Sequence, residues 1–236
     1  MIDIHSHILP GVDDGADSLD TSVAIIRELV SQGVTDIIAT PHFIDETIYA
    51  TARRENLRLL DDVKRAIANE RIEAKLHVGN EIYINDKIDE LITFNRISAL
   101  ADSQYLLIEL PMSGELAGYE DIFRDLMRND YKIILAHPER YTAMQGDFGI
   151  LERLTEMGVL LQCNTGSFIR QYGKHAEKVA VQLAKRDMIF ALGSDMHHTR
   201  GGEEITQSIK KLKKYYNDEA LERVLTGNAQ EIIGVV

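Results

Sequence analysis

The chain has 236 residues, of which 26 are Lys or Arg and 38 are Asp or Glu, giving a formal charge of −12. Hydrophobic residues make up 44% and charged residues 27%, an ordinary balance for a globular protein. This length fits one large α/β domain or two small ones, and it can bury a sizeable core. The acidic charge argues against a nucleic-acid-binding protein, which usually carries a basic face.

Two features of the sequence indicate the cellular compartment of the protein. No apolar run approaches the ~20 residues of a membrane span, and the first residues lack the basic and apolar regions of a secretory signal. The single cysteine, Cys163, cannot form an internal disulfide, so we expect a cytoplasmic protein with no direct membrane insertion. The same count excludes structural zinc sites that need two or more cysteines.

Strand-like apolar runs alternate with helical patterns along the chain. The runs lie at 2–5, 35–40, 75–79, 105–110, 132–136, 159–163 and 188–192. Such alternation predicts parallel strands joined by crossover helices. Seven units with no boundary between them favour a single barrel-like domain over residues 1–236. An open doubly wound sheet is the alternative, although no Gly-rich phosphate loop follows any run.

Helices are predicted where apolar residues recur at helical spacing. The first stripe consists of Leu19, Val23, Ile26, Leu29 and Val30. Asp17 or Ser18 can cap the start of this helix, and Gly33 suits the position just after its end. A second helix is predicted by the stripe Leu57, Leu60, Val63 and Ile67, and further helices at 121–128, 150–157, 176–185 and 205–215.

Polar side chains follow each predicted strand at the point where it ends. In chain order they are His5-Ser6-His7, Pro41-His42, Asn80-Glu81, Glu109, His137, Asn164 and Ser194-Asp195-Met196-His197. The carboxyl ends of the strands share one face of a parallel barrel, and that face carries the active site. We therefore expect these side chains to converge. Imidazoles and carboxylates are the ligands that hold Zn, Mn or Fe.

Each of these groups has an ordinary explanation when taken alone. A His-x-His pair can lie on the surface, Asp13-Asp14-Gly15 reads as a turn, and Glu109 could be a buried ion-pair partner. Together they amount to five of the eight histidines beside four carboxylates, Asp14, Glu81, Glu109 and Asp195. Buried charges are costly unless they are paired or bind a metal, so the set predicts a metal centre.

The remaining histidines are not assigned to this centre. His77 is expected inside a strand, either in the core or behind the ligands. His175 is expected on the surface near a helix start, and His198 is expected to point away from the ligands or to line the rim.

The ordered motifs resemble one known superfamily over nearly the whole chain. They are His5-Ser6-His7, Val12-Asp13-Asp14-Gly15, Pro41-His42, Gly79-Asn80-Glu81, Ile108-Glu109-Leu110, His137-Pro138-Glu139-Arg140-Tyr141 and Ser194-Asp195-Met196-His197. The chain resembles the polymerase-and-histidinol-phosphatase (PHP) superfamily, and more closely the bacterial manganese-dependent protein-tyrosine phosphatases of capsule and exopolysaccharide operons. The resemblance implies a distorted seven-stranded, TIM-like (β/α)7 barrel.

The resemblance also implies a site with three divalent ions, of which Mn²⁺ is expected first and Fe or Zn would suit the same ligands. The implied ligand sets are His5, His7, Glu109 and Asp195 for one ion, Glu81, Glu109 and His137 for the second, and Asp14, His42 and His197 for the third. Glu109 would bridge two ions. Three divalent ions carry a charge of +6 and four carboxylates −4, and the surplus of +2 matches a phosphate dianion.

A mechanism follows from these expectations. Clustered divalent ions lower the pKa of a bound water, so a metal-activated hydroxide can attack phosphorus, with Glu109 and His197 among the ligands that form the catalytic centre. The fork of Arg140 suits two phosphate oxygens, although a salt bridge with Glu139 or another carboxylate is the alternative. Arg200 is the next candidate for this role. A tyrosine phenolate, with a pKa of about 10, leaves with little proton donation.

Other hydrolase mechanisms lack support. A cysteine-dependent phosphatase needs five residues between its Cys and Arg, whereas six separate Cys163 from Arg170. No Gly-x-Ser-x-Gly motif is present. A histidinol-phosphate phosphatase or another PHP phosphoesterase stays open, as does a non-catalytic metal-dependent module. By resemblance, the substrate would be a phosphotyrosine protein, the tail of a membrane-associated tyrosine kinase; the oligomeric state is open.

Overall fold

The computed structural model describes residues 1–114 and 118–235. Its strands are β1 (Ile2–Ser6), β2 (Asp36–Ala39), β3 (His42–Phe43), β4 (Lys75–Val78), β5 (Glu81–Tyr83), β6 (Tyr105–Glu109), β7 (Lys132–Leu135), β8 (Leu160–Asn164) and β9 (Ala191–Gly193). Its α-helices are α1 (Leu19–Ser31), α2 (Arg53–Asn69), α3 (Ile88–Thr93), α4 (Tyr119–Arg128), α5 (Thr142–Gly146), α6 (Gly149–Glu156), α7 (Gly173–Lys185), α8 (Glu204–Leu212), α9 (Asp218–Glu222) and α10 (Asn228–Ile232). Single turns lie at η1 (Leu100–Asp102), η2 (Pro138–Arg140), η3 (Thr165–Ile169) and η4 (Arg223–Gly227).

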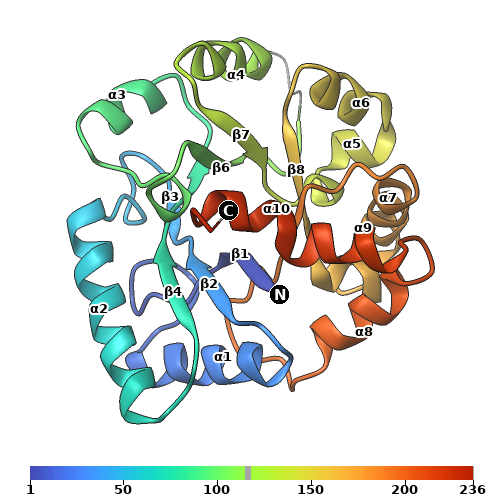
Figure 1. Ribbon diagram of the computed structural model, residues 1–236. Helices are drawn as coiled ribbons and strands as arrows, with labels where there is room; N and C mark the ends of the chain where they lie inside the picture. Colours follow the sequence, from blue (N-terminus) through green and yellow to red (C-terminus); the bar gives the residue numbers. More distant parts are fainter. Residues whose placement is uncertain (115–117, 236) are drawn as a thin grey trace.

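All paired strands are parallel, as the alternation of runs and helices predicts. One sheet has the order β1-β2-β4 and the other the order β3-β5-β6-β7-β8-β9. The first and last strands lie side by side, because Asp195 N donates to His5 O at 2.8 Å and His7 N donates to Met196 O at 3.1 Å. The sheets therefore form one curled parallel surface, inside the ring of helices in Figure 1.

Each of the seven predicted runs overlaps a strand, but the described residues hold nine strand segments. The two extra segments, β3 and β5, are only two and three residues long, too short to give a periodic pattern. They continue β2 and β4 after short interruptions, one of which contains Pro41, a residue without a backbone N–H. Glu81 N donates to Pro41 O at 3.1 Å across these interruptions. The last strand begins at Ala191, three residues later than expected.

The helices cover the outer face of the strands. Ser18 caps α1, since its side chain accepts a hydrogen bond from Thr21 N, and Gly33 follows the helix with a φ of 89°. The predicted helices are present as α1, α2, α4, α6, α7 and α8, with ends shifted by a few residues. Four further helices, α3, α5, α9 and α10, have five or six residues each and show no readable stripe.

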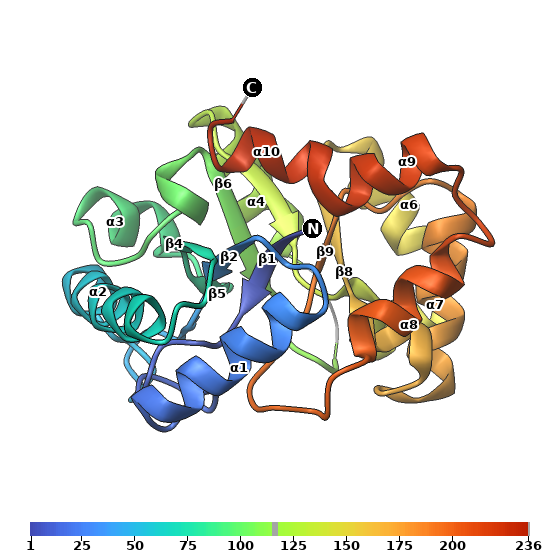
Figure 2. The same ribbon diagram turned by 60° about the horizontal axis from the view of Figure 1, so that its bottom comes forward.

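The interior of the curled sheet is filled by apolar side chains at the end where the strands begin. Ile4, Ile38, Leu107 and Ile134 pack there with Ile232 of α10. Figures 1 and 2 show α10 lying across this end, close to the N-terminus. With one end covered, the opposite end, where the strands finish, is left for the polar side chains.

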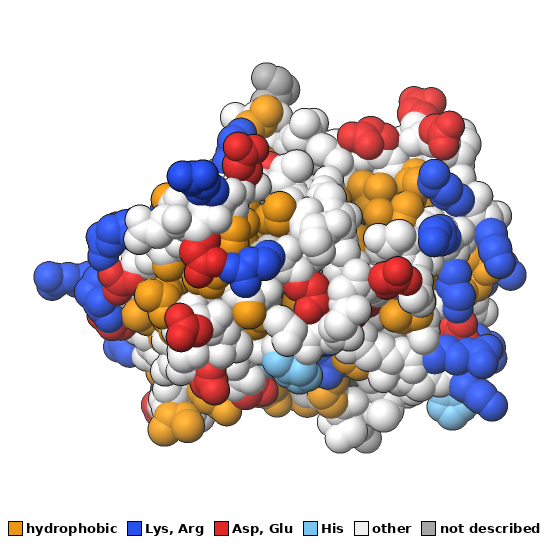
Figure 3. All heavy atoms as spheres, turned by 90° about the horizontal axis from the view of Figure 1, so that it is seen from below, with side chains coloured by type: hydrophobic (Ala, Val, Ile, Leu, Met, Phe, Trp, Pro, Cys, Tyr) orange, Lys and Arg blue, Asp and Glu red, His pale blue; other side chains and the backbone are white. Residues whose placement is uncertain are grey.

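The surface carries both acidic and basic side chains, as the composition implies (Figure 3). On the side shown in Figure 3, acidic, basic and apolar side chains are interspersed over the middle of the face, and Lys and Arg side chains gather along its right-hand edge. Within residues 1–114 and 118–235, no helix combines the length and apolar character needed to cross a bilayer.

Candidate metal centre

The polar side chains predicted at the strand ends meet around one pocket. The pocket has a volume of about 300 Å³. Its lining residues are Asp14, His42, Ile44, Tyr49, Glu81, Tyr83, Glu109, His137, Arg140, Asp195 and His197. His5 and His7 are fully buried and contact these groups from the end of β1. The structure thus brings together all the residues named as ligands from the sequence.

Glu81 is the carboxylate on which the imidazoles converge. Its Oε2 lies 3.1 Å from His5 Nε2, 3.3 Å from His7 Nε2 and 3.0 Å from His42 Nδ1. Its Oε1 lies 2.7 Å from His137 Nε2. Glu81 starts β5 directly after the Gly79-Asn80 interruption, which places it at the carboxyl end of the β4/β5 pair.

The donor set fits a metal ion. Glu81 Oε2 and His42 Nδ1 are buried and have no hydrogen-bond partner in the described part of the chain. The Nε2 atoms of His5 and His7 face each other at 3.2 Å beside that carboxylate. Imidazole nitrogens and carboxylate oxygens that converge on one point, some of them buried without a hydrogen-bond partner, provide the ligands that Mn, Fe or Zn take.

A second group lies toward the pocket mouth. Asp14 Oδ1 is 3.3 Å from His197 Nε2 and 3.5 Å from His42 Nε2, and the His7 and His197 rings stack with centroids 3.9 Å apart. Asp14, His42, His197 and His7 could hold one ion together. These include the three residues that the resemblance assigns to the third ion.

Glu109 lies farther from the imidazoles than Glu81 does. Its oxygens are 3.8 Å from His42 Nδ1 and from His137 Nε2. It groups with His42 and Glu81, whereas His5 and His7 group with Glu81. This arrangement differs from the implied ligand sets, in which Glu109 joins His5 and His7. The bridging role of Glu109 stays a prediction.

The carboxylates and imidazoles shift each other's pKa values. Burial opposes a charge on His5, but Glu81 and Asp195 outweigh it and raise the His5 pKa to about 9. Burial, together with the negative charge of Glu81, raises the pKa of Glu109 to about 8. A hydrogen bond to His197 lowers the pKa of Asp14 to about 2. The cluster is therefore a strongly interacting set of charges.

Two side chains orient the first histidines, and sequence reasoning did not assign them this role. Asp13 Oδ2 accepts a hydrogen bond from His7 Nδ1 at 2.7 Å, and Gln162 Oε1 accepts one from His5 Nδ1 at 2.9 Å. These bonds turn both Nε2 atoms toward Glu81. The sequence predicts only a turn at Asp13. Gln162 carried a readable signal, namely a polar residue inside an apolar strand.

Arg140 lies at the pocket and pairs with a carboxylate. Its Nη1 donates to Asp195 Oδ2 at 2.6 Å, and its guanidinium lies over the Tyr172 ring at 4.6 Å. Asn164 Nδ2 donates to the same oxygen at 2.7 Å. The sequence-based alternative of a salt bridge is therefore present, with Asp195 rather than Glu139. The phosphate-clamping role stays a prediction.

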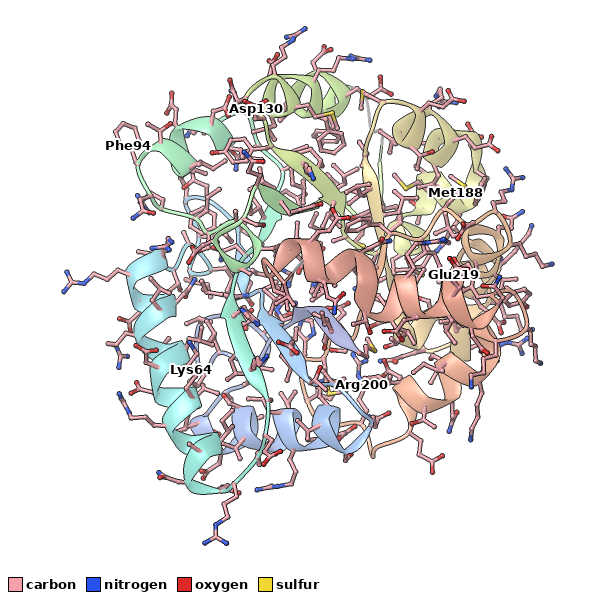
Figure 4. All side chains as sticks on the ribbon, in the orientation of Figure 1. Lys64, Phe94, Asp130, Met188, Arg200 and Glu219 are labelled. Carbon is pink, nitrogen blue, oxygen red and sulfur yellow. The ribbon has the colours of Figure 1, made fainter. Side chains whose placement is uncertain are left out.

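Arg200 lies beside the centre but does not line the pocket. Its guanidinium donates to Glu204 Oε2 at 2.7 Å and to Asp195 O at 2.9 Å, and its backbone N donates to Glu28. Figure 4 places Arg200 between α1 and α8, which carry those two glutamates. These contacts indicate that Arg200 connects α1, α8 and the backbone at Asp195.

Of the histidines set aside from the centre, His175 and His198 lie where the sequence places them, whereas His77 lies neither in the core nor behind the ligands. Cys163 is fully buried, and burial raises the pKa of its thiol well above the usual value. His77 is partly exposed, with Nε2 3.4 Å from Asp36 Oδ1. His175 and His198 are exposed.

The fold and the site define a TIM-like α/β protein of the metal-dependent hydrolase class. The chain belongs to the family described as "Capsular polysaccharide synthesis, CpsB/CapC", whose model matches residues 1–234. The resemblance stated from the motifs is thereby confirmed at the level of the family.

Relatives of known name match the chain along its length. Tyrosine-protein phosphatase YwqE of Bacillus subtilis (strain 168) is 31% identical over 99% of this chain and 91% of its own. Tyrosine-protein phosphatase CpsB of Streptococcus pneumoniae is 28% identical over 99% of this chain and 98% of its own.

Solved structures agree with the fold. One, described under "Crystal structures of YwqE from Bacillus subtilis and CpsB from Streptococcus pneumoniae, unique metal-dependent tyrosine phosphatases", has a TM-score of 0.90 and 29% identity, covering 100% of this chain and 95% of its own. The phosphotriesterase from Mycobacterium tuberculosis shares the fold alone, with a TM-score of 0.57 and 14% identity over 91% of this chain and 84% of its own.

Proposed function

We propose that this protein is a metal-dependent phosphomonoesterase that hydrolyses phosphotyrosine in proteins. The observation that carries the proposal is the convergence of five imidazoles and four carboxylates on one pocket, with an arginine at its edge. The names of the relatives, which span 99% of the chain, supply the phosphotyrosine substrate.

Three divalent ions, Mn²⁺ first, are part of this proposal. His5, His7, Glu81 and Asp195 would hold ions at the pocket floor, Glu109 and His137 at its side, and Asp14, His42 and His197 at its mouth. Divalent ions there would neutralise phosphate charge and lower the pKa of a coordinated water. Asp13 and Gln162 keep the His7 and His5 rings turned toward the ligand set.

The role of Arg140 is to hold the phosphoryl group. Asp195 accepts from only one of its guanidinium nitrogens, Nη1, so the side chain is anchored while it lines the pocket. A guanidinium can donate two parallel hydrogen bonds to phosphate oxygens. Its charge would then stabilise the charge that develops on the phosphoryl oxygens during transfer.

The proposal extends to the cellular setting and the architecture. The substrate would be a membrane-associated tyrosine kinase of capsule or exopolysaccharide synthesis, met in the cytoplasm, where a reduced Cys163 is expected.

Residues 1–236 would form one domain, a seven-stranded barrel in which β2 and β3, and likewise β4 and β5, each act as one strand. The backbone bond from Glu81 N to Pro41 O supports that count.

The test compares two substrates on protein of measured metal content. A phosphotyrosyl peptide and histidinol phosphate are assayed before and after chelation, with Cys163→Ser as a control. We expect the peptide to be preferred, chelation to abolish turnover and re-added Mn²⁺ to restore it. Cys163→Ser should leave turnover unchanged because its thiol is buried outside the pocket.

Preference for histidinol phosphate would instead assign the rival activity. Loss of activity in folded Cys163→Ser protein would contradict the metal-dependent mechanism. A fully metal-loaded protein that hydrolyses neither substrate would favour a non-catalytic module.

A further inference from the structure

Two chemically different kinds of side chain line the pocket. One kind comprises the candidate ligands and Arg140, and the other comprises three side chains with large apolar surfaces, Ile44, Tyr49 and Tyr83. No metal or phosphoryl contact calls for these three residues. Because these side chains line the same pocket as the candidate ligands, they are available to contact another part of a substrate.

The three side chains come from two neighbouring segments. Ile44 and Tyr49 lie in the connection that follows β3, and Tyr83 ends β5, the strand that pairs with β3. The Tyr49 ring lies at 29° to the His42 ring, with centroids 6.1 Å apart. Tyr83 is the register partner of Glu109 in the parallel ladder. This apolar wall is thus attached directly to the ligand cluster.

We propose that the Ile44, Tyr49 and Tyr83 wall binds the aromatic ring of the substrate and so selects aryl phosphates over alkyl phosphates. The inference rests on the proposed function and names the residues that determine its specificity. With the phosphoryl group held by the candidate ligands and Arg140, the bridging oxygen would carry the rest of the substrate toward these apolar side chains. A ring placed there packs against tyrosine faces, an arrangement that favours aromatic groups.

Charge in the pocket favours an uncharged ring. Every carboxylate that lines it in the described part of the chain is a candidate metal ligand, namely Asp14, Glu81, Glu109 and Asp195. The acidic residues next to Ile44 along the chain face Lys87, whose Nζ is 2.9 Å from Glu46 and 3.9 Å from Asp45. Among residues 1–114 and 118–235, a phosphate ester that carries an ammonium group, such as histidinol phosphate, finds no free anion along the wall.

The experiment removes the ring of Tyr49 and compares ligands with and without an aromatic group. Tyr49→Ala, Tyr49→Phe and the control Ile48→Ala are prepared with measured metal content. Ile48 lies next to Tyr49 but is 88% exposed and does not line the pocket. Readouts are kcat and KM on a phosphotyrosyl peptide, inhibition by phenylphosphonate, which has a ring, and inhibition by inorganic phosphate, which has none.

We expect Tyr49→Ala to keep its metal and lower kcat/KM by about 2- to 13-fold, mainly through KM, as the loss of one aromatic contact implies. Inhibition by phenylphosphonate should weaken by the same factor, and inhibition by inorganic phosphate should stay unchanged. Tyr49→Phe keeps the ring and should therefore lose less of its kcat/KM than Tyr49→Ala, whereas Ile48→Ala should behave like the unmodified protein. Tyr83→Leu, tested in the same way, should repeat the pattern of Tyr49→Ala.

Two results would overturn the inference. One is an equal loss of affinity for phenylphosphonate and inorganic phosphate in Tyr49→Ala, which would assign Tyr49 to supporting the metal centre. The other is no change for any ligand in both Tyr49→Ala and Tyr83→Leu. Failure of the proposed function is recognised separately, because the unmodified, metal-loaded protein would then leave the phosphotyrosyl peptide intact.

Discussion

Glu81 and Glu109 are neighbours in the cluster, but their surroundings differ. The Glu81 carboxylate lies within 3.3 Å of four imidazoles, whereas the oxygens of Glu109 lie 3.8 Å from their nearest imidazoles. A carboxylate that lies beside several other candidate ligands can bind more than one ion together with them. The position of each glutamate therefore predicts how much metal its loss releases.

Glu81→Gln should lose more metal than Glu109→Gln. The amide keeps the shape of the side chain but removes the charge that holds the imidazole cluster together. Metal stoichiometry measured on both purified variants checks this. A greater loss in Glu109→Gln would restore the bridging role that the resemblance implies for Glu109.

Arg140→Ala should keep its metal and lose rate. Removing a charged contact to the transition state typically costs on the order of 10²-fold or more. Arg140→Lys should rescue poorly, because an ammonium cannot replace a two-pronged fork. The rate of p-nitrophenyl phosphate hydrolysis and the metal content are measured on the same sample. Metal loss alongside rate loss would mean that Arg140 acts by holding Asp195.

Asp13→Asn tests the orientation of His7. The amide is nearly isosteric, but its oxygen is a weaker acceptor for the His7 Nδ1 proton than a carboxylate is. Loss of such an orienting partner typically costs 10- to 100-fold in metal affinity. Titration of the metal-free variant with Mn²⁺ measures this. Unchanged affinity would show that the ring is held by packing alone.

At the scale of elements, the site depends on how closely three strand ends approach one another. A Cβ added to Gly193 at the end of β9 would lie 2.5 Å from His5 Cβ and 2.7 Å from Gln162 Nε2. No L side chain fits there without moving β1 or β8. The glycine thus allows β9 to bring Asp195 against the histidines of β1.

Gly193→Ala should therefore lower both the melting temperature and the metal content. Gly146→Ala is a matched control, because an added Cβ there meets nothing within 4 Å. Thermal melts and metal analysis of both variants check the expectation. If Gly193→Ala binds metal normally, the strand ends can adjust, and close approach is not required.

At the scale of the molecule, the centre joins distant parts of the chain. Its candidate ligands run from His5 to His197, so ions bound to them would connect the first strand to the last. A ligand that binds only the folded state stabilises it, by about 2.7 kcal/mol at a concentration of 100 Kd. The melting temperature should therefore report occupancy of the site.

Chelation should lower the melting temperature by about 5–10 °C relative to protein in Mn²⁺ at 100 Kd. Calorimetry before chelation, after it and after Mn²⁺ is restored measures the shift. Glu81→Gln serves as the control and should show a smaller shift. An equal shift in that variant would place the stabilising ions elsewhere.

Much of the architecture could be predicted because its causes are local. Apolar runs predict strands, the Leu19–Val30 stripe predicts α1, and Ser18 can cap a helix in any context. The short elements β3, β5 and α10 could not be predicted in this way. They exist because neighbouring strands offer them hydrogen bonds or because a core needs covering, and neither condition is visible in a two- to five-residue segment.

The sequence by itself determined which side chains stand at the strand ends, since position along a strand and residue type are both written in it. That was enough to name the family, the candidate ligands and the phosphatase hypothesis. Only the tertiary structure decided that Glu81 occupies the middle of the cluster, that Asp13 and Gln162 orient the first histidines, and that Arg140 pairs with Asp195. These relations depend on distances between segments far apart in the chain, which are set by how the sheet curls and not by any local pattern.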